Sequence, residues 1–596
     1  MVSVQVNERK RDDALFQNLL EQGHEGRIAD FLARRLSKAV SPAQLARPSL
    51  ADIPDPSAIP DMERAVERMV RAIVDRERII FAVDHDMDGQ ASAAVLWAAF
   101  VDFFDVEPGL ISVVTSHRLT EGYGITDAVA DRIIASDASL IISADKGSSD
   151  EKRIQRIAAS GKDVVVTDHH EVPLEGPPES AYACVNPARK DSSYDPFVCG
   201  AGVAFLTAAK VRSALLAQGH RSKIKSLLGL TDYVAVATVA DCVALRPDRS
   251  IVNRALIRSG LQLINQESRP CWQAFRANLK QEGPISSQTI AFSLAPAVAS
   301  AGRLDWAETG FRFLVARSLS EANTQWAVLA SENEERKRIE RDIRSIAMAS
   351  AEKQSGSASL VLIEQGHSGV HGITASRLVE RFGKPAAVFS CKGSGARTSD
   401  GDVQEGNADI ITGSFRSVDG LNIRDALQRV HERNPGMLIS FGGHAGAAGA
   451  TLDRAAFERF ESEFNEAVRV LTKARVFAPE VWTDGSLPDA DLNIDSADSF
   501  AELDPWGKDF PQPTFKGRFQ VQQCRSMGDG SHWRLVLLSG TQIVEAVWFS
   551  ATVPGGDAPV QEGDEIDSAY QLSINTYRGR RKLQLQIVWA QAIDLA

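Results

Sequence analysis

Four short clusters of aspartate and histidine lie within the first 241 residues and constrain the fold more than any other feature of the chain. The clusters are DHDMDG at 84–89, ADKG at 144–147, TDHH at 167–170 and VAD at 239–241. Each follows an apolar run that we place as a buried strand; the runs are 79–83, 140–143, 164–166 and 233–237. Continuous apolar runs of this length are typical of parallel strands covered on both faces, so the sequence predicts an α/β fold with a doubly wound parallel sheet.

The clusters are expected to share one crevice, because ligands in open α/β sheets gather at the carboxyl ends of the strands. Asp-x-Asp-Gly or His-His alone is ordinary turn chemistry. Four clusters that each carry aspartate after a predicted strand instead favour a metal site. They would bring at least five carboxylates to one place, and cations are needed to offset that negative charge. Oxygen ligands suit Mg²⁺ or Mn²⁺, and the added imidazoles favour Mn²⁺.

In this order the clusters closely resemble motifs one to four of the DHH phosphoesterase superfamily. Further segments resemble the RecJ-like exonucleases within it; they are RLTEGYG at 118–124, CVNP at 184–187, CGAGVAF at 199–205, AGRL at 301–304, GSFRS at 413–417 and GGHAGAAG at 442–449. The resemblance covers about residues 60–596. It implies a DHH doubly wound domain joined by a long helix to a second α/β domain (DHHA1), plus a C-terminal OB-fold β-barrel.

The chain divides into five predicted parts. Strand-like and helix-like segments alternate from residue 56, a charged stretch without Gly or Pro follows at 318–352, and short strands separated by turns begin near 475. We therefore expect an N-terminal helical extension, a DHH catalytic domain, a connecting helix, a DHHA1 domain and an OB-fold nucleic-acid-binding domain. Their expected ranges are 1–55, 56–315, 316–352, 353–472 and 473–596.

The resemblance implies a role for each acidic and imidazole side chain. Asp145 is expected to bridge two ions, and a pair of divalent ions can activate a bridging water for phosphodiester hydrolysis. The other expected metal ligands are Asp84 and Asp86 for one ion, and Asp88, His169 and Asp241 for the second. Asp168 and His170 are expected to orient His169 or to touch the scissile phosphate, and they complete the catalytic set with Asp145 and His169.

Other side chains are expected to hold the substrate. By resemblance, Ser414 and Arg416 bind a 5′-terminal phosphate and Arg118 and Arg303 assist, because the planar guanidinium group matches phosphate oxygens. A pocket for that phosphate would place the first internal linkage over the metals. His444 would contact a phosphate through the Gly-Gly-His loop. From the residues alone, a glycine turn with an incidental histidine is the alternative.

Aromatic and basic residues suggest contacts with bases. Tyr123 is expected to stack on a base, with a buried core tyrosine as the alternative. The basic segment 577–582 (YRGRRK) is either a single-strand-binding hairpin tip or a solvated loop. Trp506, Trp533 and Trp548 can also stack on bases, but the core is the commoner place for tryptophan.

Three positions depart from the pattern of the RecJ-like exonucleases. His85 stands where these proteins usually carry Tyr or Phe, and it either adds a metal ligand or packs. Lys146 follows the bridging aspartate, and strand alternation is expected to turn it away from the metals. The segment 296–303 (PAVASAGR) lacks the Arg and Asn common between Pro and Gly, which removes part of the expected contact with the DNA end.

Composition is that of an ordinary soluble protein, with 44% hydrophobic and 24% charged residues among 596. The start lacks a signal-peptide core and no run reaches transmembrane length, so we expect a cytoplasmic protein without a membrane partner. Six Cys without a C-x-x-C pair argue against a zinc ribbon or a disulfide framework. With a net charge of −12, nucleic acid must bind along local basic stripes.

The sequence is thus interpreted as a monomeric, Mn²⁺- or Mg²⁺-dependent 5′→3′ exonuclease that hydrolyses single-stranded DNA to 5′-mononucleotides in recombination and repair. Its expected partners are single-stranded DNA with a 5′ end and a single-strand-binding protein or helicase. One alternative is a phosphodiesterase of short oligonucleotides or cyclic dinucleotides, against which residues 475–596 argue because such relatives usually lack a terminal barrel. The other is a non-catalytic replication or repair factor, which would have lost metal ligands.

Overall fold

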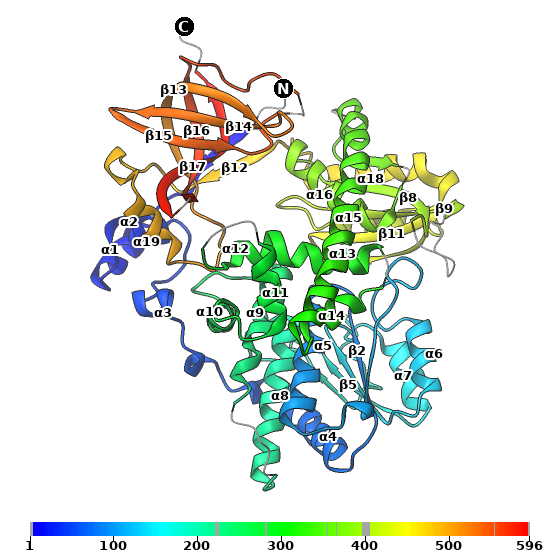
Figure 1. Ribbon diagram of the computed structural model, residues 1–596. Helices are drawn as coiled ribbons and strands as arrows, with labels where there is room; N and C mark the ends of the chain where they lie inside the picture. The colour runs from blue at the N-terminus through cyan, green and yellow to red at the C-terminus, as the bar shows by residue number, and fades with distance from the viewer. Residues whose placement is uncertain are drawn as a thin grey trace.

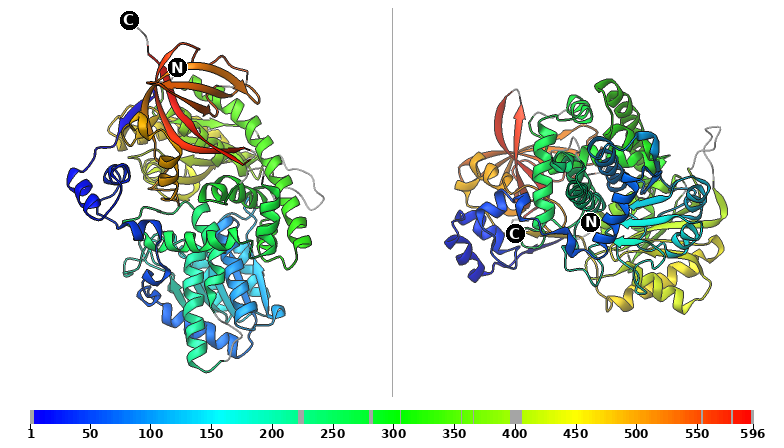
Figure 2. Two further views of the ribbon diagram at one scale, coloured as in Figure 1. Left: turned by 60° about the vertical axis from the view of Figure 1, so that its left-hand side comes forward. Right: turned by 90° about the horizontal axis from the view of Figure 1, so that it is seen from below.

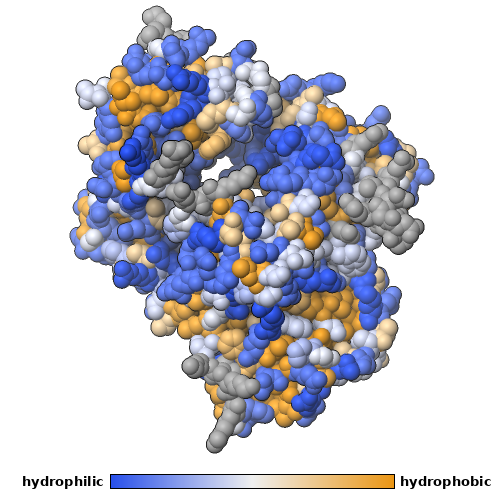
Figure 3. Space-filling view, in the orientation of Figure 1, coloured by the Kyte–Doolittle hydropathy of each residue, from blue (hydrophilic) through white to orange (hydrophobic). Residues whose placement is uncertain are grey.

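The protein forms two α/β domains and a β-barrel arranged around a central hollow (Figures 1 and 3). This computed structural model describes residues 4–220, 226–279, 283–304, 306–354, 356–364, 366–395, 406–552, 555–577 and 579–593, apart from the side chain of Tyr577. Figure 3 shows the hollow between the barrel and the second α/β domain, rimmed mostly by hydrophilic residues.

The first α/β domain is built on a five-stranded parallel sheet. Its strands are β2 (Ile79–Val83), β3 (Ile111–Val114), β4 (Leu140–Ala144), β5 (Asp163–Thr167) and β6 (Ala183–Val185), in the order β3-β2-β4-β5-β6. All neighbouring strands pair in parallel. The strand order reverses between β2 and β4, so their carboxyl ends border the crevice in which sheets of this kind bind ligands.

Helices cover both faces of this sheet, because successive side chains of a strand point to opposite faces. Ile80 and Ala82 face the helices α6 (Asp127–Ala135) and α7 (Glu151–Ala159). Phe81 and Val83 face the opposite core, to which α4 (Met62–Val74), α5 (Met87–Ala98), α8 (Gly200–Ala217) and α9 (Thr231–Ala240) contribute. The predicted doubly wound sheet is therefore confirmed.

Helix α8 is long and apolar enough to cross a membrane, judged by length and composition, and no other helix in the described part of the chain meets this test. Within the protein, 61% of α8 is buried. It packs against α4, α5 and α9, so its apolar residues belong to the core of the first domain.

A block of helices follows this core and leads to the second α/β domain. The helices are α10 (Ile251–Asn265), α11 (Pro270–Asn278), α12 (Ser287–Thr289), α13 (Ala295–Leu304), α14 (Glu308–Leu314) and α15 (Leu319–Lys353). Helix α15 has 35 residues and begins after the N-cap Ser318, whose side chain accepts a hydrogen bond from the Glu321 amide. The long helix predicted from the charged stretch without Gly or Pro is therefore present.

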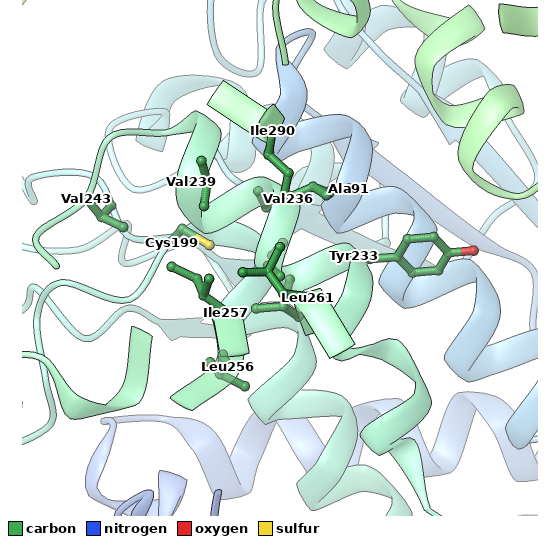
Figure 4. Close-up of a cluster of buried hydrophobic side chains, with 14 of the residues drawn as sticks. Ala91, Cys199, Tyr233, Val236, Val239, Val243, Leu256, Ile257, Leu261 and Ile290 are labelled. Atoms are coloured by element: carbon green, nitrogen blue, oxygen red, sulfur yellow. The ribbon is translucent and has the colours of Figure 1, made fainter. Parts of the chain in front are cut away.

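The fourth cluster does not follow a strand, and that prediction was wrong. Residues 231–240 form α9, and Asp241 is its C-cap. Periodicity cannot distinguish a short buried helix from a strand when every position is apolar or buried, as it is here up to Val239. In Figure 4, Val236 and Val239 of α9 lie in a buried cluster with Ala91 of α5 and Ile257 of α10. This packing holds Asp241 at the edge of the sheet.

The second α/β domain has a mixed five-stranded sheet. Its strands are β7 (Leu360–Ile363), β8 (Ala386–Lys392), β9 (Asn407–Arg416), β10 (Leu438–Gly443) and β11 (Ala447–Asp453), in the order β10-β11-β9-β8-β7. Helices α17 (Ile423–Arg433) and α18 (Phe457–Leu471) share one hydrophobic cluster with the sheet. Helix α16 (His371–Phe382) and the end of α15 share a second cluster on the sheet.

The C-terminal strands form a closed barrel, as the OB-fold prediction requires. They are β13 (Phe515–Met527), β14 (His532–Ser539), β15 (Gln542–Trp548), β16 (Glu565–Tyr577) and β17 (Arg580–Ala592), in the order β13-β14-β15-β17-β16. Trp506, Trp533 and Trp548 are buried, so these tryptophans are core residues. Arg578, at the tip of the predicted basic hairpin, lies outside the described residues.

The N-terminal extension is bound to the segment that precedes the barrel. Strand β1 (Gln5–Glu8) pairs in parallel with β12 (Glu480–Thr483), and the helices α1 (Asp13–Glu21), α2 (Gly26–Ala33) and α3 (Pro42–Ala46) follow it. Arg35 forms a two-pronged ion pair with Asp484. Helix α19 (Ile494–Ala501) completes this region, where both termini lie near the barrel (Figure 2). The predicted helical extension thus contains three helices and, in addition, a short strand. The strand was missed because it has four residues and its partner is more than 470 residues away.

Arg254 of α10 joins the first domain to the same C-terminal segment, and it generates a stability prediction. Its buried guanidinium donates hydrogen bonds to the carbonyl oxygens of Leu245, Leu503 and Pro505. Arg254→Met leaves these oxygens unpaired, at a cost of about 1–3 kcal/mol each. We expect the free energy of unfolding to fall by roughly 3 kcal/mol or more, measured from the first urea unfolding transition. Arg249→Met, at an exposed position just before α10, is the control. Equal stability of the two variants would contradict this role.

Candidate metal centre and phosphate pocket

The ends of three strands and one helix bring the predicted ligands together. Asp84 directly follows β2, Asp86 is the N-cap of α5, Asp145 follows β4, His169 follows β5, and Asp241 caps α9. Three groups have ligand atoms within 4.8 Å of one another: Asp84, Asp86 and Asp145; Asp88, His169 and Asp241; and Asp145, His169 and His170. Asp145 belongs to two of these groups, so it is placed to reach two ions.

The Nε2 atom of His169 lies at the centre of the acidic side chains. It is 3.2 Å from Asp145 Oδ1, 3.5 Å from Asp241 Oδ2 and 3.6 Å from Asp88 Oδ2. His169 Nε2, Asp145 Oδ1 and Asp84 Oδ1 are all buried and have no hydrogen-bond partner among the described residues. Buried polar atoms are almost always paired. Converging oxygens around one imidazole nitrogen therefore fit a divalent cation such as Mn²⁺.

The charges of this group oppose one another unless a cation is bound. Burial, together with the neighbouring aspartates, raises the pKa of Asp145 and of Asp241 well above the ordinary value for a carboxyl group. The same causes raise the pKa of Asp88 to about 6. Burial, and next the charge of His170, lower the pKa of His169 to about 3, so its imidazole is neutral and offers a lone pair. A divalent cation bound among these side chains would offset the repulsion and favour their charged forms, which are the forms that bind metal.

Asp168 and His170 form a pair behind the ligands. Asp168 accepts hydrogen bonds from the amides of Ser148 and His169, at 2.9 and 2.8 Å, and from His170 Nδ1 at 2.8 Å. Burial alone would raise the pKa of Asp168, but the His170 imidazolium holds it below its ordinary value. Burial alone would lower the pKa of His170, but Asp168 raises it to about 10. Asp168 therefore orients the His169–His170 segment, and His170 remains a cation at neutral pH.

Close backbone packing fixes the ligands, and the sequence did not reveal this. Asp88 accepts hydrogen bonds from the amides of Gly200 and Ala201 at the start of α8, at 2.6 and 2.8 Å. A Cβ atom on Gly200 would lie 2.6 Å from the Cβ of Asp145. A Cβ atom on Gly89 would lie 2.4 Å from the carbonyl oxygen of Asp84. Gly89 and Gly200 are thus needed for this close approach.

Beside the carboxylates, three half-buried arginines form a positively charged group, named the arginine pocket for the anion that it is expected to hold. Arg118, Arg303 and Arg416 act on one another electrostatically, and in the described part of the chain they make no ion pair. Burial, and next the charge of Arg118, lower the pKa of Arg303 to about 9. The guanidinium of Arg118 lies over the ring of Tyr123, 4.9 Å from its centroid. Tyr123 is 61% exposed, so it is available for stacking and is not a core residue. Three cations without a carboxylate partner make a site for an anion.

The second α/β domain completes both parts of the site. Arg416 and Ser414 lie on β9, next to β11. His444, in the turn between β10 and β11, stacks on His170 with ring centroids 5.7 Å apart and lies 3.7 Å from Glu171. The Gly-Gly-His loop therefore meets the metal centre across the interface between the two domains.

The positions that depart from the family pattern are explained by their surroundings. His85 is buried with its ring 4.7 Å from that of Tyr123, and its Nδ1 lies 3.2 Å from Asp84 Oδ1. Lys146 is buried, and Asp84 is the largest charge that offsets the lowering of its pKa by burial. Strand alternation was expected to turn it away from the metals, but its charge acts on Asp84 and Asp145. The strand β4 ends at Ala144 and Asp145 adopts a φ of +61°, so alternation does not extend to Lys146.

The raised pKa of Asp88 predicts how stability depends on pH without metal. An unfolded Asp ionises near pH 4, whereas Asp88 in the folded protein ionises near pH 6. The folded state therefore binds more protons in this window, and its stability falls as the pH rises through it. The Asp88→Asn variant lacks this contribution to the pH dependence of stability, because an asparagine side chain does not ionise. In EDTA its stability relative to the natural protein should increase by up to roughly 3 kcal/mol between pH 4.5 and 7. Urea unfolding at several pH values measures this, and a difference that does not change with pH would contradict it.

The domains and their order match known families. Residues 78–238 match the DHH family, N-terminal domain, residues 356–470 match the DHHA1 domain, and residues 483–588 match the RecJ OB domain. In solved structures, the fold is similar to that of RecJ in complex with Mn²⁺ from Thermus thermophilus. That similarity has a TM-score of 0.79 at 23% identity and covers 99% of this chain and 80% of that chain.

Full-length relatives agree with these matches. The single-stranded-DNA-specific exonuclease RecJ of Dickeya dadantii (strain 3937) is 32% identical over 576 residues, which cover 93% of this chain and 95% of the relative. RecJ of Escherichia coli (strain K12) is 32% identical over 578 residues, which cover 94% and 96%. The resemblance inferred from the motifs is thereby confirmed, and the chain belongs to the RecJ family of single-stranded-DNA-specific exonucleases.

Proposed function

We propose that this protein is a Mn²⁺- or Mg²⁺-dependent 5′→3′ exonuclease that hydrolyses single-stranded DNA to 5′-mononucleotides. The observation that carries the proposal is the adjacency of two unlike sites: a group of carboxylates with imidazoles, and a pocket of three arginines. His85 and Tyr123 connect them, since the rings of these residues are in contact and Arg118 lies over Tyr123.

Two ions are assigned to the ligand groups around Asp145. One would be held by Asp84, Asp86 and Asp145, and the other by Asp88, Asp145, His169 and Asp241. When bound, such a pair supplies an activated water and neutralises the charge of the phosphate that is cleaved. His170, which is cationic at neutral pH, and His444, stacked on it, are placed to donate hydrogen bonds to that phosphate.

The arginine pocket accounts for the direction of cleavage. Arg118, Arg303 and Arg416, with Ser414, would bind the terminal 5′ phosphate, because planar guanidinium groups hold phosphate oxygens in fixed geometry. A strand held at this point would present its first internal linkage to the metals. Tyr123, exposed beside the pocket, would stack on a base near the 5′ end.

The proposal includes the setting of the reaction. We infer that the protein acts in the cytoplasm as a monomer, in recombination and repair, on strands made available by a single-strand-binding protein or a helicase. Near-complete matches to RecJ exonucleases favour this over a phosphodiesterase of short oligonucleotides or cyclic dinucleotides. The complete set of ligands argues against a non-catalytic binding factor.

Removing the shared carboxylate tests the metal assignment. Asp145→Ala should lower the rate of nucleotide release at least about 10³-fold, because both ions lose a ligand. Binding of single-stranded DNA, measured by fluorescence anisotropy, should change little. Asp137→Ala, at an exposed position before β4, is the matched control. Full activity of Asp145→Ala would refute the assignment, and failure of the natural protein to degrade strands with Mn²⁺ would refute the function.

Removing one arginine tests the 5′-phosphate pocket. Arg416→Ala should raise KM for 5′-phosphorylated strands by about 10- to 100-fold, the effect of losing one buried charge-assisted contact. The change should be much smaller for 5′-hydroxyl strands, because they lack the group that Arg416 binds. Arg469→Ala, an exposed arginine on α18, should match the natural protein on both. An equal loss on both strands would contradict the pocket.

A further inference from the structure

A turn from the C-terminal part of the chain lies against the metal centre. Residues 507–510 form this turn, closed by hydrogen bonds between the backbones of Gly507 and Phe510 at 3.0 and 3.1 Å. The carbonyl oxygen of Lys508, within the turn, accepts a hydrogen bond of 3.0 Å from the amide of Leu245. Leu245 is four residues after the ligand Asp241. The turn is therefore attached to the loop that carries one of the metal ligands.

Aromatic packing holds this turn in place. Phe510 and Trp506 are buried and stacked, with ring centroids 5.0 Å apart, and Phe31 of the N-terminal extension packs on both. Arg254 binds the preceding backbone at Pro505 and lies over the Phe510 ring. Lys508 itself is exposed at the tip of the turn. Because the backbone of the turn is fixed, the exposed lysine is preorganised for contact with a substrate.

Lys508 lies on the Asp241 side of the metal centre, because its carbonyl oxygen is bonded to the amide of Leu245 in the loop that follows Asp241. Burial raises the pKa of Asp241, and Lys508, like His170, opposes that increase. Burial and His170 lower the pKa of His169, and Lys508 adds to that decrease. In the described part of the chain Lys508 makes no ion pair. Its exposed side chain is thus carried on the Asp241 side of the centre by the bonded backbone and is available to a ligand.

The arginine pocket lies on the other side of the same centre. Arg118 lies over Tyr123, whose ring is 4.7 Å from that of His85, and His85 Nδ1 lies 3.2 Å from Asp84. The backbone of Lys508 is instead bonded to Leu245, in the loop that follows Asp241. A strand with its 5′ phosphate among the arginines must cross the ligands and leave on the side of Lys508. On the side where Lys508 lies, the charged groups of the substrate strand are the phosphates on the 3′ side of the cleaved linkage.

We propose that Lys508 is a positioning residue that binds a backbone phosphate of the substrate on the 3′ side of the scissile linkage. This inference rests on the proposed function. Through Lys508, the C-terminal part of the chain would contact the substrate next to the phosphate that is cleaved. This contact would add to any binding of the strand by the barrel. One lysine–phosphate contact at a partly solvated site contributes roughly a 5- to 10-fold effect on binding.

The test replaces single phosphates in the substrate with neutral ones. The substrates are 5′-phosphorylated single strands that carry one methylphosphonate at the second, third, fourth or fifth linkage. Release of the first nucleotide is measured as kcat/KM. For the natural protein, a methylphosphonate at one of these positions should lower kcat/KM by about 5- to 10-fold. On the unmodified strand, kcat/KM of Lys508→Ala should be lower than that of the natural protein by the same factor. At that one position, the methylphosphonate should cause no further loss in Lys508→Ala.

Control variants separate this contact from a structural effect. Lys508→Arg should restore both the rate and the sensitivity to methylphosphonate, because it restores the charge. Lys353→Ala, at an exposed position at the far end of α15, should behave as the natural protein. The proposal is overturned if Lys508→Ala matches the natural protein on the unmodified strand, or remains equally sensitive at every linkage. A natural protein that releases no nucleotide from any strand would refute the proposed function instead.

Discussion

Repulsion among buried carboxylates is the constraint on which the rest of the structure depends. Asp88, Asp145 and Asp241 lie around one imidazole nitrogen, and burial with mutual repulsion raises the pKa of each. Without compensation, such a group opposes folding at neutral pH. A divalent cation reverses the sign of the interaction, because each carboxylate then faces a positive charge. The fold therefore keeps an arrangement that is unfavourable alone and favourable with metal.

Several distant parts of the chain cooperate to hold this arrangement. The ends of β2, β4 and β5 supply ligands at the point where the strand order reverses, and α9 supplies Asp241. The start of α8 approaches so closely that Gly200 has no room for a side chain. The second α/β domain adds His444 and Arg416, and the segment before the barrel is fastened to α10 by Arg254. The site thus depends on both α/β domains and on the segment that precedes the barrel.

Much of this could be predicted from local patterns. The apolar runs before Asp84, Asp145 and Asp168 identified three buried strands, and the stretch without Gly or Pro identified α15. The motif resemblance placed the barrel and the second α/β domain. The prediction failed where local pattern is ambiguous or where the cause is distant. The apolar run before Asp241 is compatible with a strand and with a helix. The four residues of β1 form a strand because they pair with β12, far along the chain.

The side chains predicted to hold metal lie close together, but the contacts that support them were not foreseen. Sequence motifs name ligands, whereas the close contact of Gly200 with Asp145 depends on the docking of α8. Strand alternation was applied to Lys146 beyond the end of its strand, where the positive φ of Asp145 redirects the chain. The most direct test of the account is the anomalous scattering of Mn²⁺ in a crystal of this protein. We predict two peaks that share Asp145, one beside Asp84 and Asp86 and one beside His169 and Asp241. Peaks elsewhere, or no peak at these side chains, would contradict it.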